Sequence, residues 1–335
     1  MNTKRIVSLF ASLSLVLSMS LGLTGCGDKA AQDDNQGSTD GESTKYTVGI
    51  CQLVQHEALD AATQGFIDAL NEALPGEVEF QTKNASGDSA NCSTIVNGFV
   101  SDKVDLIMAN ATGALTAAAA ATSDIPILGT SITAYGVALD IDDFDGTVGG
   151  NISGTSDLAP LPEQAKMIRE LVPGAKKVGL LYCSAEPNSE YQIQEIELEL
   201  ASLGLESRRF SFTDSNDISS VATNACAYAD AIYIPTDNTA ANNTEAIANV
   251  VIPAKKPVIA GEAGICRGCG IATLSIDYYK LGYETGKMAA EILKGTAKVG
   301  DMAIRYADRT ERLYNAKNCQ ALGLTPPEGY SPLAD

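Results

Sequence analysis

The sequence predicts an α/β protein built from two doubly wound lobes, each a parallel sheet with helices on both faces. Short continuous apolar segments alternate with helical patterns, which is typical of buried parallel strands and their crossover helices. The same landmarks then occur in two halves of the chain. About 290 residues follow the N-terminal segment, which suits two domains of about 150 residues each.

The first half shows strand and helix patterns in alternation. Apolar strands are expected at residues 45–50, 104–108 and 125–129. Between them, residues 59–74 and 93–101 carry apolar side chains at spacings of three and four, which predicts amphipathic helices. This order of elements is that of a doubly wound sheet.

The second half repeats this plan. Strands are expected at residues 176–180, 229–233 and 256–261, with a helix over 189–203. Val48 and Pro126 are 78 positions apart in the first half, and the matching Val178 and Pro257 are 79 apart. This repeated spacing predicts two equivalent lobes.

The C-terminal part has elements without a counterpart in the first half. Strands at 270–276 and 302–306 and helices at 278–294 and 315–322 are expected. The simplest arrangement returns the chain to the first lobe for one helix and back again for the tail, so that three crossings form a multi-strand hinge. The expected boundaries are 46–153 plus about 277–297 for the first lobe and 154–276 plus about 298–330 for the second.

The N-terminus has the order of an export signal. MNTKR precedes a long apolar run that ends in Leu23-Thr24-Gly25-Cys26, which resembles a lipobox, and residues 1–25 are expected to be a lipoprotein signal peptide. Cys26 would carry the lipid; an ordinary cleaved signal is the alternative. Residues 27–45 lack large apolar side chains, so residues 26–45 are expected to be a lipidated cysteine with a disordered tether.

Charge and cysteine content exclude several classes of protein. The formal charge of −19 becomes −21 once Lys4 and Arg5 leave with the signal, so a nucleic-acid partner is not expected. Seven cysteines remain after Cys26, and most are expected to be buried apolar side chains. Cys266 and Cys269 form one C-x-x-C, which is insufficient for structural zinc; a local disulfide or two free thiols are the alternatives. No metal or cofactor is expected.

Open parallel sheets bind ligands at the carboxyl ends of their strands, so candidate ligand contacts are expected at those ends. Hydroxyl, amide and carboxylate side chains recur there. The candidates found in this way are Gln55, His56, Thr112, Ser131, Thr133, Ser184, Glu186, Asn188, Ser189, Asp237, Asn238, Thr239, Glu262 and Asp277.

These side chains suit a small zwitterion. Hydroxyls, amides and helix N-termini can bind a carboxylate, and one acidic group can bind an ammonium. We expect Ser184, Asn188 and Ser189 to hold the carboxylate and Asp237 or Asp277 to hold the ammonium. The alternative for each residue is a helix N-cap without a ligand.

Catalysis is not expected. The sequence has no G-x-S-x-G, Walker or H-E-x-x-H motif, and His56 is the only histidine available to a catalytic triad. Cys183 and Ser184 could serve an enzyme, but no base is paired with them in sequence. Such an enzyme would convert its ligand.

Several longer stretches resemble the lipoprotein substrate-binding proteins of bacterial ABC importers, in the family that binds tryptophan and tyrosine. They are residues 55–60 (QHEALD), 154–157 (GTSD), 182–189 (YCSAEPNS), 235–239 (PTDNT), 261–262 (GE), 276–279 (IDYY) and 281–283 (LGY). The resemblance adds Ser156 and Asp157 to the candidates. It implies a type I periplasmic-binding fold that encloses a ligand by hinge closure, and ABC permease subunits as partners.

The resemblance also implies a place and a ligand class. The protein would lie outside the cytoplasm, held to the membrane by its lipid, and would bind an aromatic or other amino acid. Where the family usually has Asp-Pro after Thr133, this chain has Ala134-Tyr135, and Tyr135 could supply a ring to the ligand. A sensory lipoprotein and a nucleoside- or sugar-binding protein of the same fold are the alternatives.

Overall fold

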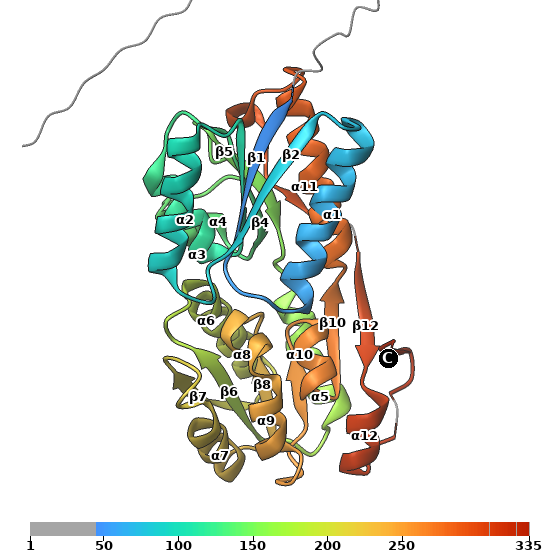
Figure 1. The fold of residues 1–335 in the computed structure, drawn as a ribbon. Helices are drawn as coiled ribbons and strands as arrows, with labels where there is room; N and C mark the ends of the chain where they lie inside the picture. Colours follow the sequence, from blue (N-terminus) through green and yellow to red (C-terminus); the bar gives the residue numbers. More distant parts are fainter. Residues whose placement is uncertain (1–44, 308, 326, 335) are drawn as a thin grey trace, which may run out of the picture. The chain divides into compact units, whose positions relative to one another are not determined.

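The computed structural model describes residues 45–334 apart from 308 and 326. The expected signal peptide, the lipidated Cys26 and nearly all of the tether lie outside the described residues. Within the described part, no helix is both long and apolar enough to cross a membrane. The described residues belong to one compact unit, which contains two sheets (Figure 1).

The first lobe is a parallel sheet with helices on both faces. Across the sheet its described strands are β11 (Arg305–Tyr306), β5 (Ile152–Ser156), β4 (Ile127–Ile132), β3 (Leu106–Asn110), β1 (Tyr46–Gln52) and β2 (Val78–Asn84). Its helices are α1 (Glu57–Ala73), α2 (Ser89–Asp102), α3 (Thr112–Ala121), α4 (Tyr135–Leu139) and α11 (Tyr278–Leu293), followed by the short 3₁₀ turn η1 (Val299–Asp301).

The second lobe has the same core with an extension at one edge. Its described strands are β13 (Ser331–Pro332), β12 (Thr310–Tyr314), β10 (Ala272–Ile276), β9 (Val258–Ala260), β8 (Ala231–Ile234), β6 (Lys177–Cys183) and β7 (Glu206–Phe212), and β12 is antiparallel to β10. Its helices are α5 (Leu161–Leu171), α6 (Pro187–Ser202), α7 (Ile218–Tyr228), α8 (Asn238–Asn242), α9 (Thr244–Val251), α10 (Ala263–Gly268) and α12 (Ala316–Leu322).

The inner strands of each sheet are buried on both faces, which explains their continuous apolar sequences. In β3, Leu106 and Met108 belong to the core beneath α1 and α11, whereas Ile107 and Ala109 belong to the core beneath α2 and α3. Successive side chains of a strand point to opposite faces, so a strand covered on both sides must be apolar throughout. The predicted doubly wound fold is confirmed.

Helix α11 lies beside α1, far from it in sequence (Figure 1). The two helices approach through glycines: a Cβ placed on Gly282 would lie 1.9 Å from the carbonyl oxygen of Ala62, and one on Gly65 would lie 2.1 Å from that of Tyr279. Such close contact of backbones leaves no room for a side chain. This packing fixes α11 to the first lobe.

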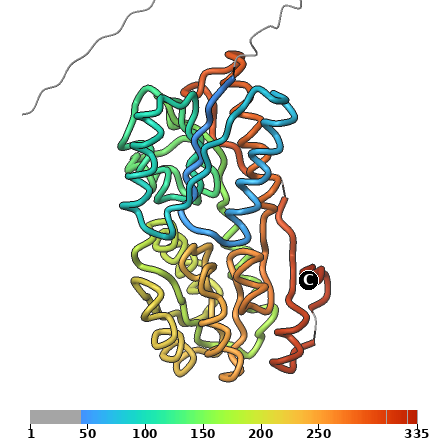
Figure 2. The backbone as a smooth tube through the Cα atoms, viewed as in Figure 1, coloured from blue at the N-terminus to red at the C-terminus, as the bar shows by residue number. Residues whose placement is uncertain are grey.

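Within the described residues the chain passes between the lobes three times, which Figure 2 follows as green, orange and red segments. The first passage lies three residues after the expected boundary, and the third lies about nine residues after it. β5 pairs in the first sheet through Ser156, so the first passage follows residue 156 rather than 153. β11 pairs with β5, Arg305 opposite Thr155, so the tail enters the second lobe after residue 306 rather than 297.

Candidate functional site

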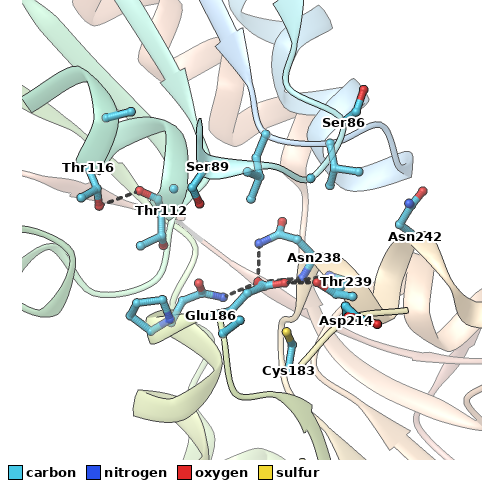
Figure 3. Close-up of a pocket in the computed structure, with 18 of the residues that line it drawn as sticks. Ser86, Ser89, Thr112, Thr116, Cys183, Glu186, Asp214, Asn238, Thr239 and Asn242 are labelled. Carbon is cyan, nitrogen blue, oxygen red and sulfur yellow. Dashed lines mark hydrogen bonds between the residues drawn. The ribbon is translucent and has the colours of Figure 1, made fainter. Parts of the chain in front are cut away.

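A cavity of about 600 Å³ lies between the carboxyl ends of the strands of the two lobes, a size typical of small-molecule sites. Figure 3 shows Ser86, Ser89, Thr112 and Thr116 of the first lobe facing Glu186, Asn238 and Thr239 of the second. The lining residues are Leu53, Val54, Ser86, Gly87, Ser89, Ser93, Thr112, Gly113, Thr116, Ala117, Ala120, Cys183, Ala185, Glu186, Pro187, Asn188, Thr213, Asp214, Ser215, Asn238, Thr239, Asn242 and Asn243.

The first lobe contributes the N-terminus of α3. Thr112 and Gly113, the first two residues of this helix, line the cavity. The first N–H groups of a helix have no partner within it, and the helix dipole adds partial positive charge there. Ser89, at the start of α2, brings a hydroxyl to the same wall. This wall can bind a carboxylate without a basic side chain.

Glu186 organises the second lobe's wall. Its carboxylate accepts hydrogen bonds from Asn188 Nδ2 (3.2 Å), from the backbone N–H and side-chain Nδ2 of Asn238 (3.1 and 2.8 Å), and from the N–H and hydroxyl of Thr239 (2.8 and 2.7 Å). Two of the five donors are backbone groups at the start of α8, where an anion is stabilised. Glu186 thereby connects the loop after β6 to the loop after β8 and places a buried carboxyl group at the cavity.

Asp237 is a second buried carboxylate, behind this wall. It accepts hydrogen bonds from Cys183 N (2.6 Å), Ser189 Oγ (2.8 Å) and Ala240 N (2.8 Å), the last of which caps α8. Burial, and then the neighbouring Glu186 carboxylate, raise the pKa of Asp237 to about 7, while these donors oppose the shift. Asp237 does not line the cavity, so its hydrogen bonds hold the loops after β6 and β8 together behind the wall.

Two polar contacts join the lobes beside the cavity. His56 Nε2 lies 3.2 Å from Asn238 Oδ1. Glu57 and Arg267 form a two-pronged ion pair, with both N–O distances at 2.8 Å. Each contact pairs the start of α1 with the second lobe, so both require the lobes to be close together.

The electrostatics of the cavity favour a ligand with a positive group. Among the described residues its lining contains two carboxylates, those of Glu186 and Asp214, and no lysine, arginine or histidine. The described part of the chain places no aromatic side chain in the lining either. Hydroxyls and amides dominate, so the site recognises its ligand mainly through hydrogen bonds.

The structure brings five of the sequence-predicted residues to this cavity: Thr112, Glu186, Asn188, Asn238 and Thr239. Gln55 and His56 line a neighbouring cavity of about 290 Å³, and Glu262 and Asp277 line a third of about 230 Å³. The remaining candidates line none of these three cavities: Ser131, Thr133, Ser156, Asp157, Ser184, Ser189 and Asp237. Asp237, Glu262 and Asp277 are helix N-caps, the alternative weighed for each such residue.

Asp157 and Tyr135 lie in buried networks near the hinge. Asp157 accepts hydrogen bonds from the hydroxyls of Thr133 and Tyr278, both at 2.9 Å. The Tyr135 hydroxyl donates to the carbonyl of Thr155 at 3.2 Å, and its ring is buried in the first lobe's core. The expectation that Tyr135 could supply a ring to the ligand is wrong, because its ring fills the space beside Gly129 and Gly154.

Sequence reasoning missed the lining residues that follow the edge strands. Ser86, Gly87 and Ser89 follow β2, and Thr213 to Ser215 follow β7. Both strands lie at the outer edge of their sheets and are partly exposed. Their alternating polar residues (VEFQTKN and ESRRFSF) do not form continuous apolar runs. A search for period-two alternation would have found them.

The cysteines are buried thiols. In the described residues Cys51, Cys92, Cys183, Cys226, Cys266, Cys269 and Cys319 are all free and buried, as expected of most of them. Cys266 lies in α10 and Cys269 directly after it, rather than in a loop. Cys183 lines the cavity, and burial together with Asp237 and Glu186 raises its pKa to about 11. A thiol that stays protonated near neutral pH is a poor nucleophile.

Glu262 makes the stability of the fold depend on pH. Burial raises the pKa of its carboxyl to about 7 from an ordinary value of 4.5, opposed by hydrogen bonds from Gly264 N and Ile265 N. The folded protein thus binds this proton more tightly than the unfolded chain. The group's contribution to the free energy of unfolding is full below pH 4.5 and is lost as the pH rises through about 7.

We therefore expect the melting temperature to fall less steeply between pH 5 and pH 8 in Glu262→Gln than in the unmodified protein, since glutamine stays neutral. Thermal unfolding followed by circular dichroism at four pH values measures this. Asp237 contributes with the same sign and leaves some slope in the variant. Equal slopes in the two proteins would refute the assignment to Glu262.

Comparison with known proteins identifies the family. The sequence pattern of the family described as ABC transporter substrate binding protein matches residues 47–335. The chain belongs to this family. Substrate-binding proteins of this family act outside the cytoplasm, bind small-molecule ligands and work with ABC permeases.

Similar proteins agree with this assignment. The chain is 34% identical over 329 residues to the tyrosine-binding protein of Clostridioides difficile strain R20291, covering 96% of this chain and 93% of that protein. The ABC domain from Streptococcus pneumoniae in complex with L-Trp has a TM-score of 0.82 at 31% identity, over 86% of this chain and 99% of that one. The two lobes are those of a type I periplasmic-binding protein.

A third relative indicates the arrangement of the lobes in this substrate-binding protein. The ligand-free, open structure of a substrate-binding protein with adhesive properties from Clostridium difficile is 34% identical, over 86% of this chain and 99% of that one, but has a TM-score of only 0.67. The structure with L-Trp bound is more similar despite its lower identity. Together with the contacts of His56 and Arg267 between the lobes, this indicates a closed arrangement.

Proposed function

We propose that the protein captures an amino acid in the cavity between its lobes and delivers it to an ABC importer. The observation that carries this proposal is the pairing of opposite walls. The α3 N-terminus of one lobe suits a carboxylate, and the buried Glu186 of the other suits an ammonium. Both charged ends of an amino acid then have a partner, one in each lobe.

This orientation differs from the one expected from sequence. Ser189 and Asp237 are hydrogen-bonded to each other at 2.8 Å and do not line the cavity, and Asp277 lies at another cavity beside Lys280. We therefore propose that Glu186, rather than Asp237 or Asp277, binds the ligand's ammonium group. Thr112, Gly113 and Ser89 are proposed to bind its carboxylate. Contacts from both lobes to one ligand favour closure, because only the closed state makes both sets.

Calorimetric titration of the purified protein tests the proposal. We expect an aromatic amino acid such as L-tyrosine or L-tryptophan, the ligands named for two relatives, to bind with micromolar or tighter affinity. Glucose, ribose and adenosine are the controls and should give no heat. Binding of a sugar or nucleoside with no response to any amino acid would overturn the ligand class.

The protein is proposed to bind its ligand without converting it. The only thiol in the described lining, that of Cys183, has a raised pKa and donates to the carbonyl of Thr213 at 3.6 Å. Mass spectrometry of the ligand after prolonged incubation should recover it unchanged, and a product formed in proportion to protein would indicate an enzyme.

We further propose that the mature protein is a lipoprotein held to the outer face of the cell membrane through Cys26. The support is the sequence Leu23-Thr24-Gly25-Cys26 after an apolar run. In cells that express the full chain, the protein should enter the detergent phase on Triton X-114 partitioning. Cys26→Ser should move it to the aqueous phase, and equal partitioning of both would contradict lipidation.

A further inference from the structure

His56 is the only histidine in the sequence, and it lies at the contact between the lobes. It is the N-cap residue of α1 in the first lobe, and its ring reaches Asn238 at the start of α8 in the second. It does not line the main cavity. It lies directly behind Asn238, which does.

Hydrogen-bond logic fixes the direction of the contact. The Asn238 side chain donates from Nδ2 to Glu186 Oε2 at 2.8 Å, and it must present its amide nitrogen there because an ionised carboxylate only accepts. Its oxygen Oδ1 therefore faces His56, 3.2 Å from Nε2. An oxygen can only accept, so Nε2 carries the proton. His56 thus donates to Asn238, which donates to Glu186, and this chain of hydrogen bonds leads from the first lobe to the cavity.

The other ring nitrogen determines which charge state fits. Nδ1 of His56 is buried and has no hydrogen-bond partner among the described residues. In the neutral Nε2–H tautomer this nitrogen carries only a lone pair. Protonation would place an N–H group there with no acceptor, and a buried unsatisfied donor is costly. The closed arrangement thus accommodates the neutral imidazole and disfavours the imidazolium.

The surrounding charges act against this preference but do not reverse it. On its own helix the ring faces Glu57 and Asp60, and from the second lobe Glu186, all of which favour the imidazolium. Arg267 of α10 neutralises Glu57 through their ion pair. Asn238 of α8 is uncharged. Burial outweighs these carboxylates, so the pKa of His56 lies below its ordinary value.

We propose that His56 is a positioning residue of the ligand site, which orients Asn238 toward Glu186 on closure and makes ligand binding depend on a neutral imidazole. This inference rests on the proposed function, because it requires closure around a ligand. In the open state the ring is free of Asn238 and can take up a proton. Acidification therefore favours the open state and weakens binding.

The expected size follows from one linked proton. If the exposed imidazole titrates near its ordinary value of about 6.5, binding at pH 5.5 should be weaker than at pH 7.5, and about tenfold is the limit for one linked proton. At pH 7.5, His56→Ala should weaken binding by about three- to tenfold, the equivalent of one hydrogen bond. His56→Gln places an amide donor near the position of Nε2 and cannot titrate. It should recover part of the loss and show less than about a twofold change with pH.

Two measurements test the proposal, with L-tyrosine and L-tryptophan as probes and the protein purified through a tag without histidine. Calorimetry gives Kd at pH 5.5 and 7.5 for wild type, His56→Gln and His56→Ala. ¹⁵N NMR of the single imidazole gives its tautomer and titration curve with and without the probe. We expect the Nε2–H tautomer in the saturated protein and a lower pKa on saturation.

The possible results separate this inference from the proposed function. A pH effect of equal size in wild type and His56→Gln would assign the linkage to other groups, such as Asp237 or Glu262, and overturn the role of His56. An Nδ1–H tautomer in the saturated protein would also overturn it. If no amino acid binds to wild type at either pH, the proposed function itself fails.

Discussion

Glu186→Gln is expected to abolish most ligand binding, with affinity at least 100-fold lower, and to decrease the free energy of unfolding by about 2 kcal/mol. The carboxylate accepts from five donors on Asn188, Asn238 and Thr239. Glutamine offers one oxygen and an NH₂ group, which would face a donor of the α8 turn. It also removes the buried charge proposed to hold the ammonium. Calorimetry and urea unfolding measure the two effects.

Asp214→Asn is the matched control for this prediction. Asp214 is the other carboxylate of the described cavity lining, but it is exposed and accepts a hydrogen bond from Asn216 N (2.8 Å). Because solvent screens its charge, its replacement should change affinity by less than about tenfold. Unchanged affinity in Glu186→Gln, or a larger loss of affinity in Asp214→Asn than in Glu186→Gln, would show that Glu186 does not bind the ammonium.

Gly282→Ala is expected to destabilise the protein by about 3 kcal/mol, because the added Cβ would push α11 away from α1. That atom would lie 1.9 Å from the carbonyl oxygen of Ala62, and a helix backbone cannot yield as a side chain does. The melting temperature should fall by roughly 6 °C. Urea unfolding of the variant gives the free energy directly.

Gly98→Ala provides the control of opposite sign. Gly98 lies within α2, is exposed, and has no atom within 4 Å of an added Cβ. Alanine there should stabilise the protein by about 0.5–1 kcal/mol, through its higher helix propensity. A Gly282→Ala protein as stable as wild type would show that the two helices do not pack as described.

The buried framework could be predicted from sequence because burial imposes a simple pattern. Strands such as β3 are apolar on both faces, and helices such as α1 carry apolar side chains at spacings of three and four. The repeat of the same strand and helix patterns in both halves of the chain then predicted two lobes. The edge strands β2 and β7 were not predicted, because one face of each is exposed and their sequences are not continuously apolar. The lining residues that follow them were therefore missed as well.

The roles of individual site residues were harder to predict. A carboxylate at a strand end can cap a helix or contact a ligand, and both uses place it at the same position in sequence. Asp237 and Glu186 illustrate this: Asp237 caps α8 beneath the wall, whereas Glu186 reaches across from the preceding loop to the same helix and lines the cavity. Helix capping and ligand contact can be distinguished only when it is known which loops, far apart in sequence, lie close together in the fold.

A crystal structure of the protein grown with the amino acid that binds most tightly tests the central claim most directly. We predict electron density for the ligand in the cavity between α3 and the loop of Glu186, with its carboxylate at Thr112 and Gly113 and its ammonium at Glu186. Density for the ligand at another site, with only water in this cavity, would contradict the proposal that the amino acid is captured between the lobes.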